Sequence, residues 1–194
     1  SSMYFRVSRA PALVGDYDFT TLTAEFRKYW TVDEDFTGNR TVVTLRMDVG
    51  YILEDDEAPV FERFYAGGHR SFRGFAFRGV GPRGIVGPPP PAPPGPTTGT
   101  VGDDPVGGDF LFLLGLEYNM PIYEDIVRLV FFTDTGTVQD DLGFDEYRVS
   151  IGAGLRVKIP FLGQAPFAID LAYPILKQDG DETQFFSFDL GLPF

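Results

Sequence analysis

The residues best suited to chemistry in this chain are a histidine and serine two positions apart, and two separate carboxylates. His69 is the only histidine of the 194 residues, and Ser71 follows it, so the two could act as base and nucleophile. Glu117 and Asp134 could act as a catalytic acid and base. The sequence places no third group to orient His69, and a lone histidine makes a poor metal site. We therefore expect no enzyme activity and no catalytic, metal or cofactor site.

Composition and charge exclude several further classes of function. The net charge of −12 repels nucleic acid, so we expect no nucleic-acid partner. The absence of cysteine excludes a disulfide framework and a thiolate metal site. No window of about 18 apolar residues occurs, so the sequence predicts no transmembrane helix. The mean hydropathy of −0.05 resembles that of a soluble protein, but the alternating strands of a membrane barrel average to similar values.

Apolar and polar residues alternate strictly near the C-terminus. Between residues 147 and 159, seven apolar positions alternate with six polar or glycine positions. The second set is Arg148, Ser150, Gly152, Gly154, Arg156 and Lys158. The segment that starts at Phe110 repeats the pattern, with Glu117 and Asn119 on its polar face. A period of two residues predicts β-strands that have one apolar and one polar face.

Shorter alternating segments bring the expected number of strands to about eight. They are residues 3–9, 19–30, 41–52, 126–134, 167–175 and 185–194. Because one face is charged and the other strongly apolar, the pattern favours an all-β fold, a transmembrane antiparallel up-and-down β-barrel whose charged face lines the lumen. A soluble barrel or sandwich is the alternative, but soluble lumens are apolar. We expect residues 1–194 to form one domain.

The expected connections are short at one end of the strands and long at the other. Residues 121–125 and 160–166 are predicted tight turns, whereas residues 135–146 and 54–109 are predicted long exterior loops. The longest loop includes a proline-rich insert at residues 88–96, which we interpret as a solvated segment. Three acidic clusters also fall in predicted turns and are interpreted as solvated rims, since their spacing differs from that of calcium loops. They are residues 33–35, 54–57 and 179–182.

Several motifs resemble the BamA-type outer-membrane assembly factors, also called bacterial surface antigens. Residues 61–68, followed by the sequence Ser-Phe-Arg-Gly-Phe at residues 71–75, are similar to the loop that plugs the barrel in that family. The resemblance continues in the same order through Glu117, residues 131–138 and residues 152–155. The last strand, residues 184–194, resembles a C-terminal outer-membrane targeting signal. The resemblance covers the whole chain but only the second half of a barrel of about sixteen strands.

The resemblance implies a clamp that anchors the loop inside the barrel. Arg73 is expected to enter the lumen and pair with Glu117 and Asp134, since a guanidinium can bind two carboxylates. Gly74 and Phe75 complete the motif. Two wall glycines are expected to give the loop backbone room to pass. They are Gly152 and Gly154.

The family resemblance also implies a function and a location. Family members insert other barrel proteins into the bacterial outer membrane at a seam between their first and last strands. The resemblance therefore implies outer-membrane lipids, unfolded barrel clients, and accessory lipoproteins or a missing barrel half as partners. Alternate residues of the last strand would face lipid at the seam, where the strand also serves as the C-terminal signal. These residues are Phe186, Phe188, Leu190, Leu192 and Phe194.

Eight strands leave two arrangements open. A closed eight-stranded barrel has a lumen just wide enough for side chains, so the Arg73 loop would stay outside it. Alternatively, strands of another segment or chain complete a wider barrel that admits the loop. The first arrangement would fit a small structural or residual barrel without insertion activity, and the second a part of an insertion factor; whether the chain is a fragment or a reduced protein stays open. A translocator barrel of a secretion system shares the same loop motif and remains a third possibility.

Overall fold

The computed structural model describes residues 1–10, 19–36, 38–54, 58–86, 100–124, 126–158 and 166–190. The proline-rich insert and the expected seam residues Leu192 and Phe194 lie outside the described residues. Eight antiparallel strands form one sheet with the order β1-β2-β3-β7-β8-β9-β10-β12. Their bounds are β1 Ser2–Ala10, β2 Phe19–Glu34, β3 Arg40–Glu54, β7 Phe110–Tyr123, β8 Val127–Gln139, β9 Arg148–Lys158, β10 Pro166–Leu176 and β12 Phe186–Leu190. The expected all-β fold is confirmed.

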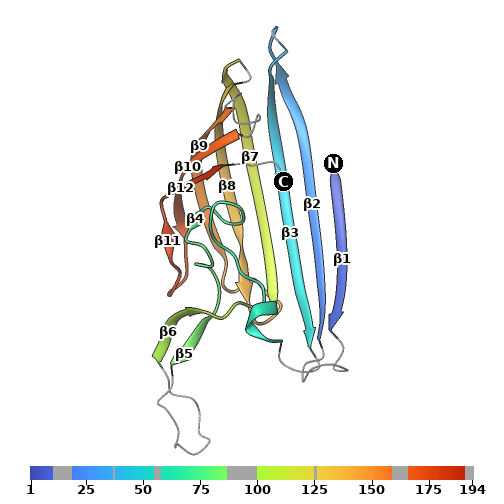
Figure 1. Ribbon diagram of the computed structural model, residues 1–194, viewed down its shortest axis with the longest axis vertical. Coiled ribbons are helices and arrows are strands. Elements are labelled where there is room, and N and C mark those ends of the chain that lie inside the picture. Colours follow the sequence, from blue (N-terminus) through green and yellow to red (C-terminus); the bar gives the residue numbers. More distant parts are fainter. Residues whose placement is uncertain are drawn as a thin grey trace, which may run out of the picture.

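The sheet curves but does not close (Figure 1). β1 and β12 occupy its two edges, and neither pairs with the other within the described residues. The closed eight-stranded barrel is therefore not the arrangement of this structure. The described part of the chain contains one helical element, the short 3₁₀ helix η1 (Val60–Glu62). No helix there is long and apolar enough to cross a membrane.

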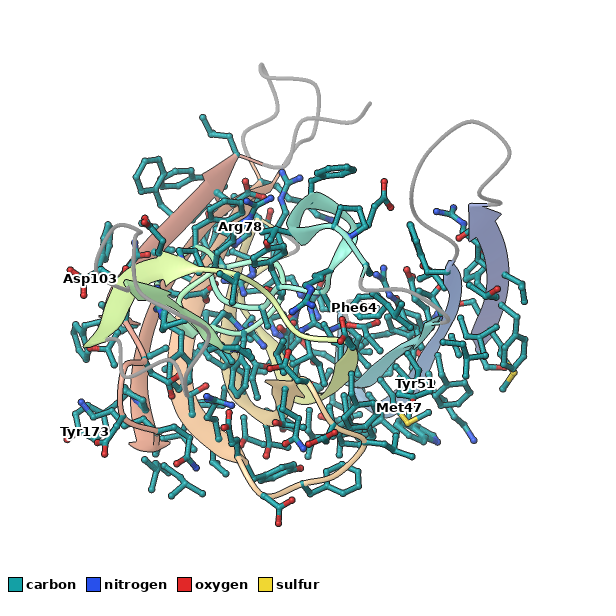
Figure 2. The ribbon with its side chains drawn as sticks, turned by 90° about the horizontal axis from the view of Figure 1, so that it is seen from below. Met47, Tyr51, Phe64, Arg78, Asp103 and Tyr173 are labelled. Atoms are coloured by element: carbon teal, nitrogen blue, oxygen red, sulfur yellow. The ribbon has the colours of Figure 1, made fainter. Side chains whose placement is uncertain are left out.

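The two faces of the sheet differ as the alternation predicts. Ser150 is fully buried on the inner face, whereas its neighbour Ile151 on the outer face is 48% exposed. On β10, Asp170 is buried and Leu171 is exposed. Viewed along the strands, Tyr173 projects from the outer side (Figure 2). An apolar outer face and a polar inner face suit a wall between lipid and lumen.

Several strands extend further than the sequence predicts, and β7 continues through residues 121–123 of a predicted tight turn. β8 continues to Gln139, so the expectation of a loop from residue 135 is wrong. The hydroxyl groups of Thr135 and Thr137 donate hydrogen bonds to the carbonyls of Arg148 and Glu146, respectively. These bonds stabilise the additional residues of β8. β2 likewise includes the acidic pair at residues 33 and 34, which were expected in a turn. These polar side chains obscure the end of a strand because polar residues are also typical of loops.

The long connection between β3 and β7 lies partly inside the curve of the sheet. Its described residues include β4 (Gly74–Phe75), β5 (Arg83–Val86) and β6 (Thr100–Pro105), and β5 and β6 form a hairpin that extends away from the sheet (Figure 1). β4 pairs with β11 (Thr183–Gln184) from the β10–β12 connection. Phe64 lies on the inner side of the sheet (Figure 2). We call the described segment from 58 to 82 the inner loop. Residues 54–109 were predicted to be a long exterior loop, and the family resemblance implied that the part around Arg73 enters the lumen; in the structure that part contacts the inner face of the sheet.

The inner loop and the sheet share a hydrophobic core. Phe72 and Phe75 are buried and meet edge to face, with their ring centroids 4.8 Å apart. They pack in one cluster with Val80 of the loop and with Leu113 and Val138 of the wall. Burying aromatic side chains is among the largest contributions to such packing. The core therefore fixes the motif against β7 and β8.

Candidate functional site: a loop clamp on the inner face

The two predicted carboxylates lie on the inner faces of neighbouring strands. Glu117 of β7 is paired with Phe132 of β8, and Gly115 is paired with Asp134. Because residues two apart on a strand share a face, Glu117 and Asp134 point to the same side of the sheet. A Cβ added at Gly115 would lie 3.0 Å from a carboxylate oxygen of Asp134. Glycine at this position therefore leaves room for the acidic group.

Arg73 of the inner loop binds both carboxylates. Its Nε and Nη2 donate to the two oxygens of Asp134 over 2.8 and 2.9 Å, and its Nη1 donates to Glu117 over 3.0 Å. The backbone N–H of Arg73 donates to Asp134 as well, over 3.1 Å. Arg73 and Asp134 are both buried, with 8% and 2% of their surfaces exposed. This bidentate geometry is the strongest form of arginine–carboxylate pairing.

The surroundings of Arg73 keep it charged. Burial lowers the pKa of the guanidinium, but hydrogen bonds and charges from Asp134 and Glu117 outweigh burial, so the pKa lies above its ordinary value. The guanidinium carbon also lies 3.5 Å from the centroid of the Phe132 ring. A cation over an aromatic face adds further attraction, most of all where water is excluded. These contacts suit a structural anchor better than proton transfer.

Gly74 allows the loop backbone to approach the wall. Its φ of +93° lies in the left-handed region that favours glycine, and an added Cβ would lie 3.1 Å from the Cβ of Ser150. The Ser150 hydroxyl donates to the Arg73 carbonyl over 2.6 Å. Gly74 and Phe75 also pair with β11. Both the side chains and the backbone of the motif are thus bound to neighbouring strands.

The two wall glycines have other residues of the sheet as their nearest neighbours. The ring of Phe132, from the same sheet, is the nearest side chain over Gly152, and the Asp170 carboxylate is the nearest over Gly154. Neither glycine has inner-loop backbone among its three nearest atoms, so these atoms give no support to direct loop accommodation at the two positions. Instead, Gly152 leaves space for the Phe132 ring on which Arg73 stacks. Gly152 thus acts on the loop through the Phe132 side chain.

His69 and Ser71 lie in the tip of the inner loop. The Ser71 hydroxyl donates to the Gly67 carbonyl over 2.7 Å and accepts from the Gly67 N–H over 3.0 Å, which closes a local turn. His69 Nε2 lies 3.1 Å from the Asp189 carboxylate of β12. Since the serine hydroxyl is engaged by backbone, the pair has the geometry of a loop turn.

Three further arginine contacts on the inner face were not predicted from the sequence. The Arg148 Nε lies 2.8 Å from the Asp181 carboxylate, and both side chains are buried. Arg156 of β9 binds Asp170 of β10 over 2.7 and 3.1 Å. Arg46 of β3 donates to two carbonyls of the inner loop. The alternation placed Arg148 and Arg156 on the polar face, but no local pattern indicates the partners of the three arginines, which are distant in sequence.

The described residues of the expected seam lie on the edge strand. Phe186, Phe188 and Leu190 of β12 are exposed on the outer face, and their register partners on β10 also point outward. β12 is five residues long, and its one strand partner within the described residues is β10. An edge strand has unpaired backbone groups that can bind another strand.

The fold and the clamp together define a class of protein: a wall of an outer-membrane β-barrel with a loop anchored on its lumen face. A family model described as the Omp85 superfamily domain matches residues 1–194, and the chain belongs to this superfamily. The expected family and the location in the bacterial outer membrane are thereby confirmed.

Individual relatives are longer than this chain. The outer membrane protein assembly factor BamA of Nitratidesulfovibrio vulgaris is 31% identical over 186 residues, which are 91% of this chain and 21% of that protein. The crystal structure of BamA from Haemophilus ducreyi lacking POTRA domains 1-3 matches with a TM-score of 0.75 and 24% identity, over 91% of this chain and 35% of that one. The second likeness concerns the fold alone.

Proposed function

We propose that these residues form the C-terminal part of the barrel of an outer-membrane assembly factor, and that β12 contributes to a seam at which client barrels fold into the membrane. Support comes from the superfamily match and from the relative named as an assembly factor. Clients, outer-membrane lipids and accessory lipoproteins are the partners proposed. The domain boundary at residues 1–194, with a connection at 54–109 that carries the motif, is part of the same proposal.

The observation that carries this proposal is the free edge of β12. Within the described residues, β12 pairs with β10 on one side and has no strand on the other. In hydrocarbon each unpaired backbone group costs several kcal/mol, so such an edge favours pairing with another strand. An unfolded client strand could satisfy these groups by extending the sheet. The mechanism is therefore physical, and we propose no covalent catalysis.

The experiment measures client insertion and contact together. The protein expressed from its complete gene is reconstituted in liposomes, and an added barrel client is allowed to fold. Folding of the client is followed by the change in its electrophoretic mobility in unheated samples. We expect faster insertion than in empty liposomes. Because these residues contain no cysteine, single cysteines can report contact with a client strand. A cysteine at Phe188 should cross-link to the client.

A cysteine at Leu129 is the matched control. Leu129 lies on β8, which has strands on both sides, and its register partners are Met120 and Leu155. We expect little cross-linking there, because the backbone of β8 is already paired. Insertion no faster than in empty liposomes would contradict the proposal and favour a structural barrel. Secretion of a passenger without barrel insertion would favour a translocator.

A further inference from the structure

The tip of the inner loop, residues 67–73, contacts opposite sides of the curved sheet. On one side Arg46 of β3 donates through Nη1 to the Arg70 carbonyl over 2.7 Å, and through Nη2 to the Ser71 carbonyl. Arg46 is held in turn by Asp48, with 3.2 Å between Nε and the carboxylate. An arginine that donates to two successive carbonyls fixes the backbone of a turn.

On the other side the tip reaches β12. Asp189 lies 3.1 Å from His69 Nε2 and 3.3 Å from Arg70 Nη2. It faces the lumen because it is in register with Ala168 of β10, while Phe188 and Leu190 point outward. The inner face of the seam strand is thus in contact with the loop through one carboxylate.

These two contacts lie far apart in the sheet. Between β3 and β12 stand four strands, β7, β8, β9 and β10. The chain that leads into β12 is also attached to the loop, since Thr183 and Gln184 of β11 pair with Phe75 and Gly74. The edge strand is therefore connected to the inner loop at its start and near its end. A force on the loop tip would reach β12 by both connections.

The anchoring contacts differ in strength. The Asp134 side chain that binds Arg73 is 3% exposed, whereas Asp189 is 24% exposed and its partner Arg70 is 72% exposed. Partly solvated ion pairs contribute much less than buried bidentate ones. The tip can therefore release β12 while Arg73 still anchors the loop.

We infer that the loop tip braces β3 against β12, and that Asp189 is the positioning residue through which the inner loop holds the edge strand in place. Loss of either end of the brace increases the opening of β12 away from β10. The brace is a property of the fold, but its role in controlling a client seam rests on the proposed function. It assigns Arg46 a long-range effect on a strand that it does not contact.

The test is hydrogen exchange of the backbone amides at residues 186–190 in the full-length protein in lipid nanodiscs. Asp189→Asn removes the charge with little change in shape, and Arg46→Gln removes the opposite end. We expect each to raise the exchange rate of β12 about fivefold, the ratio that corresponds to about 1 kcal/mol of opening free energy. The exchange rate of β12 in the double variant should be little higher than in either single variant, because both substitutions act on one brace.

Two controls separate the brace from local disturbance. Ser187→Ala lies on the same face of the same strand, and Arg27→Gln lies beside Arg46 in the register of β2 and β3. Arg27 has Glu25 of its own strand as its ionic partner. Neither control should change β12 exchange by more than about twofold, the level expected of weak surface changes.

The outcomes are distinct. Faster β12 exchange in both Asp189→Asn and Arg46→Gln, with unchanged controls, supports the brace. An effect of Asp189→Asn alone would reveal a local ion pair and overturn it, as would equal effects in the controls. Unfolding of Arg46→Gln would be recognised by loss of its gel shift, and Arg46→Lys then replaces it. Client insertion measured in parallel tests the proposed function separately, because exchange requires no client.

Discussion

Arg73 combines a buried charge, a bidentate ion pair and an aromatic contact in one side chain. Its guanidinium is shared between β7 and β8 through Glu117 and Asp134, and it stacks on Phe132. A buried charge is stable only while its partners satisfy it. The contacts that hold the loop therefore make loss of the Arg73 side chain costly, because two acidic groups would be left facing each other.

We expect Arg73→Ala to destabilise the protein by about 3–5 kcal/mol, the range found when one partner of a buried ion pair is removed. Arg73→Lys should recover only part of the loss, since an ammonium group cannot match the fork that spans both carboxylates. The measurement is the urea concentration at which the heat-modifiable gel shift is lost. Arg78→Ala is the control, because Arg78 belongs to the same loop but lies over the Tyr65 ring and is not part of the clamp. Equal midpoints for Arg73→Ala and Arg78→Ala would refute the clamp.

His69 provides a direct report on the loop tip. Burial lowers the pKa of its imidazole below 6.5, since desolvation outweighs the opposing charges of Asp189 and Asp170, and Arg70 and Arg156 lower it further. Because the folded pKa lies below the unfolded one, this group contributes stability that is complete above pH 6.5. That contribution is lost as the pH falls through the folded value.

We expect the NMR titration of the His69 ring to have a midpoint below 6.5. Asp189→Asn should lower that midpoint further, because the Asp189 charge favours the protonated ring. Ser187→Ala, on the same strand, should leave it unchanged. A midpoint above 6.5, or an upward shift in Asp189→Asn, would show that the tip does not dock against β12 as described. No other histidine among these residues interferes with the assignment.

At the scale of elements, the connection between β10 and β12 is held by a buried ion pair. Arg148 at the start of β9 contacts Asp181, whose side chain is 1% exposed. Asp181 also accepts a hydrogen bond from the Gln178 N–H over 2.7 Å. The acidic cluster at residues 179–182 was expected to be a solvated rim, and for Asp181 that expectation is wrong. A turn pattern cannot reveal a partner that lies 33 residues away in sequence.

Asp181→Asn should therefore loosen the segment from 177 to 185 and remove up to about 3–5 kcal/mol of stability, because the buried Arg148 would keep only the half-exposed carboxylate of Glu146, 3.5 Å away, as its counter-charge. Limited proteolysis should detect new cleavage in this segment. Asp179→Asn changes a charge two residues away in the same connection and should not increase cleavage. If both variants were cut at the wild-type rate, the pair would have no part in ordering the connection.

The strands themselves were more accessible to sequence reasoning than their ends and contacts. Period-two alternation located all eight strands of the sheet, because burial in lipid on one side and contact with the lumen on the other select opposite residue types. The clamp residues Arg73, Glu117 and Asp134 came from a family resemblance, and the structure brings them together. The arginine at position 46 and the carboxylate at position 189 were missed, since contacts between a wall and a loop leave no periodic signal.

At the scale of the whole molecule, the free edges decide how the barrel is completed. β1 and β12 each have one neighbour within the described residues, yet the inner loop already occupies the concave face. A closed barrel of eight strands has a lumen that only side chains can fill. The open sheet thus leaves room for the inner loop, which a closed barrel of eight strands would not. Where the sheet crosses a membrane, both of its edges need further strands as partners.

For residues 1–194 refolded alone in detergent micelles, we expect native mass spectrometry to detect two copies in each particle. Two open sheets of eight strands could satisfy four edges by pairing β1 and β12 of one copy with those of the other, which leaves a lumen wide enough for both inner loops. Arg73→Ala should lower the yield of such particles, because an unanchored loop no longer supports the open curvature. A single copy per particle, with the edges closed on each other, would contradict this expectation. The inner loop would then have to leave the lumen, and loss of protection of Phe72 and Phe75 from hydrogen exchange would reveal that displacement.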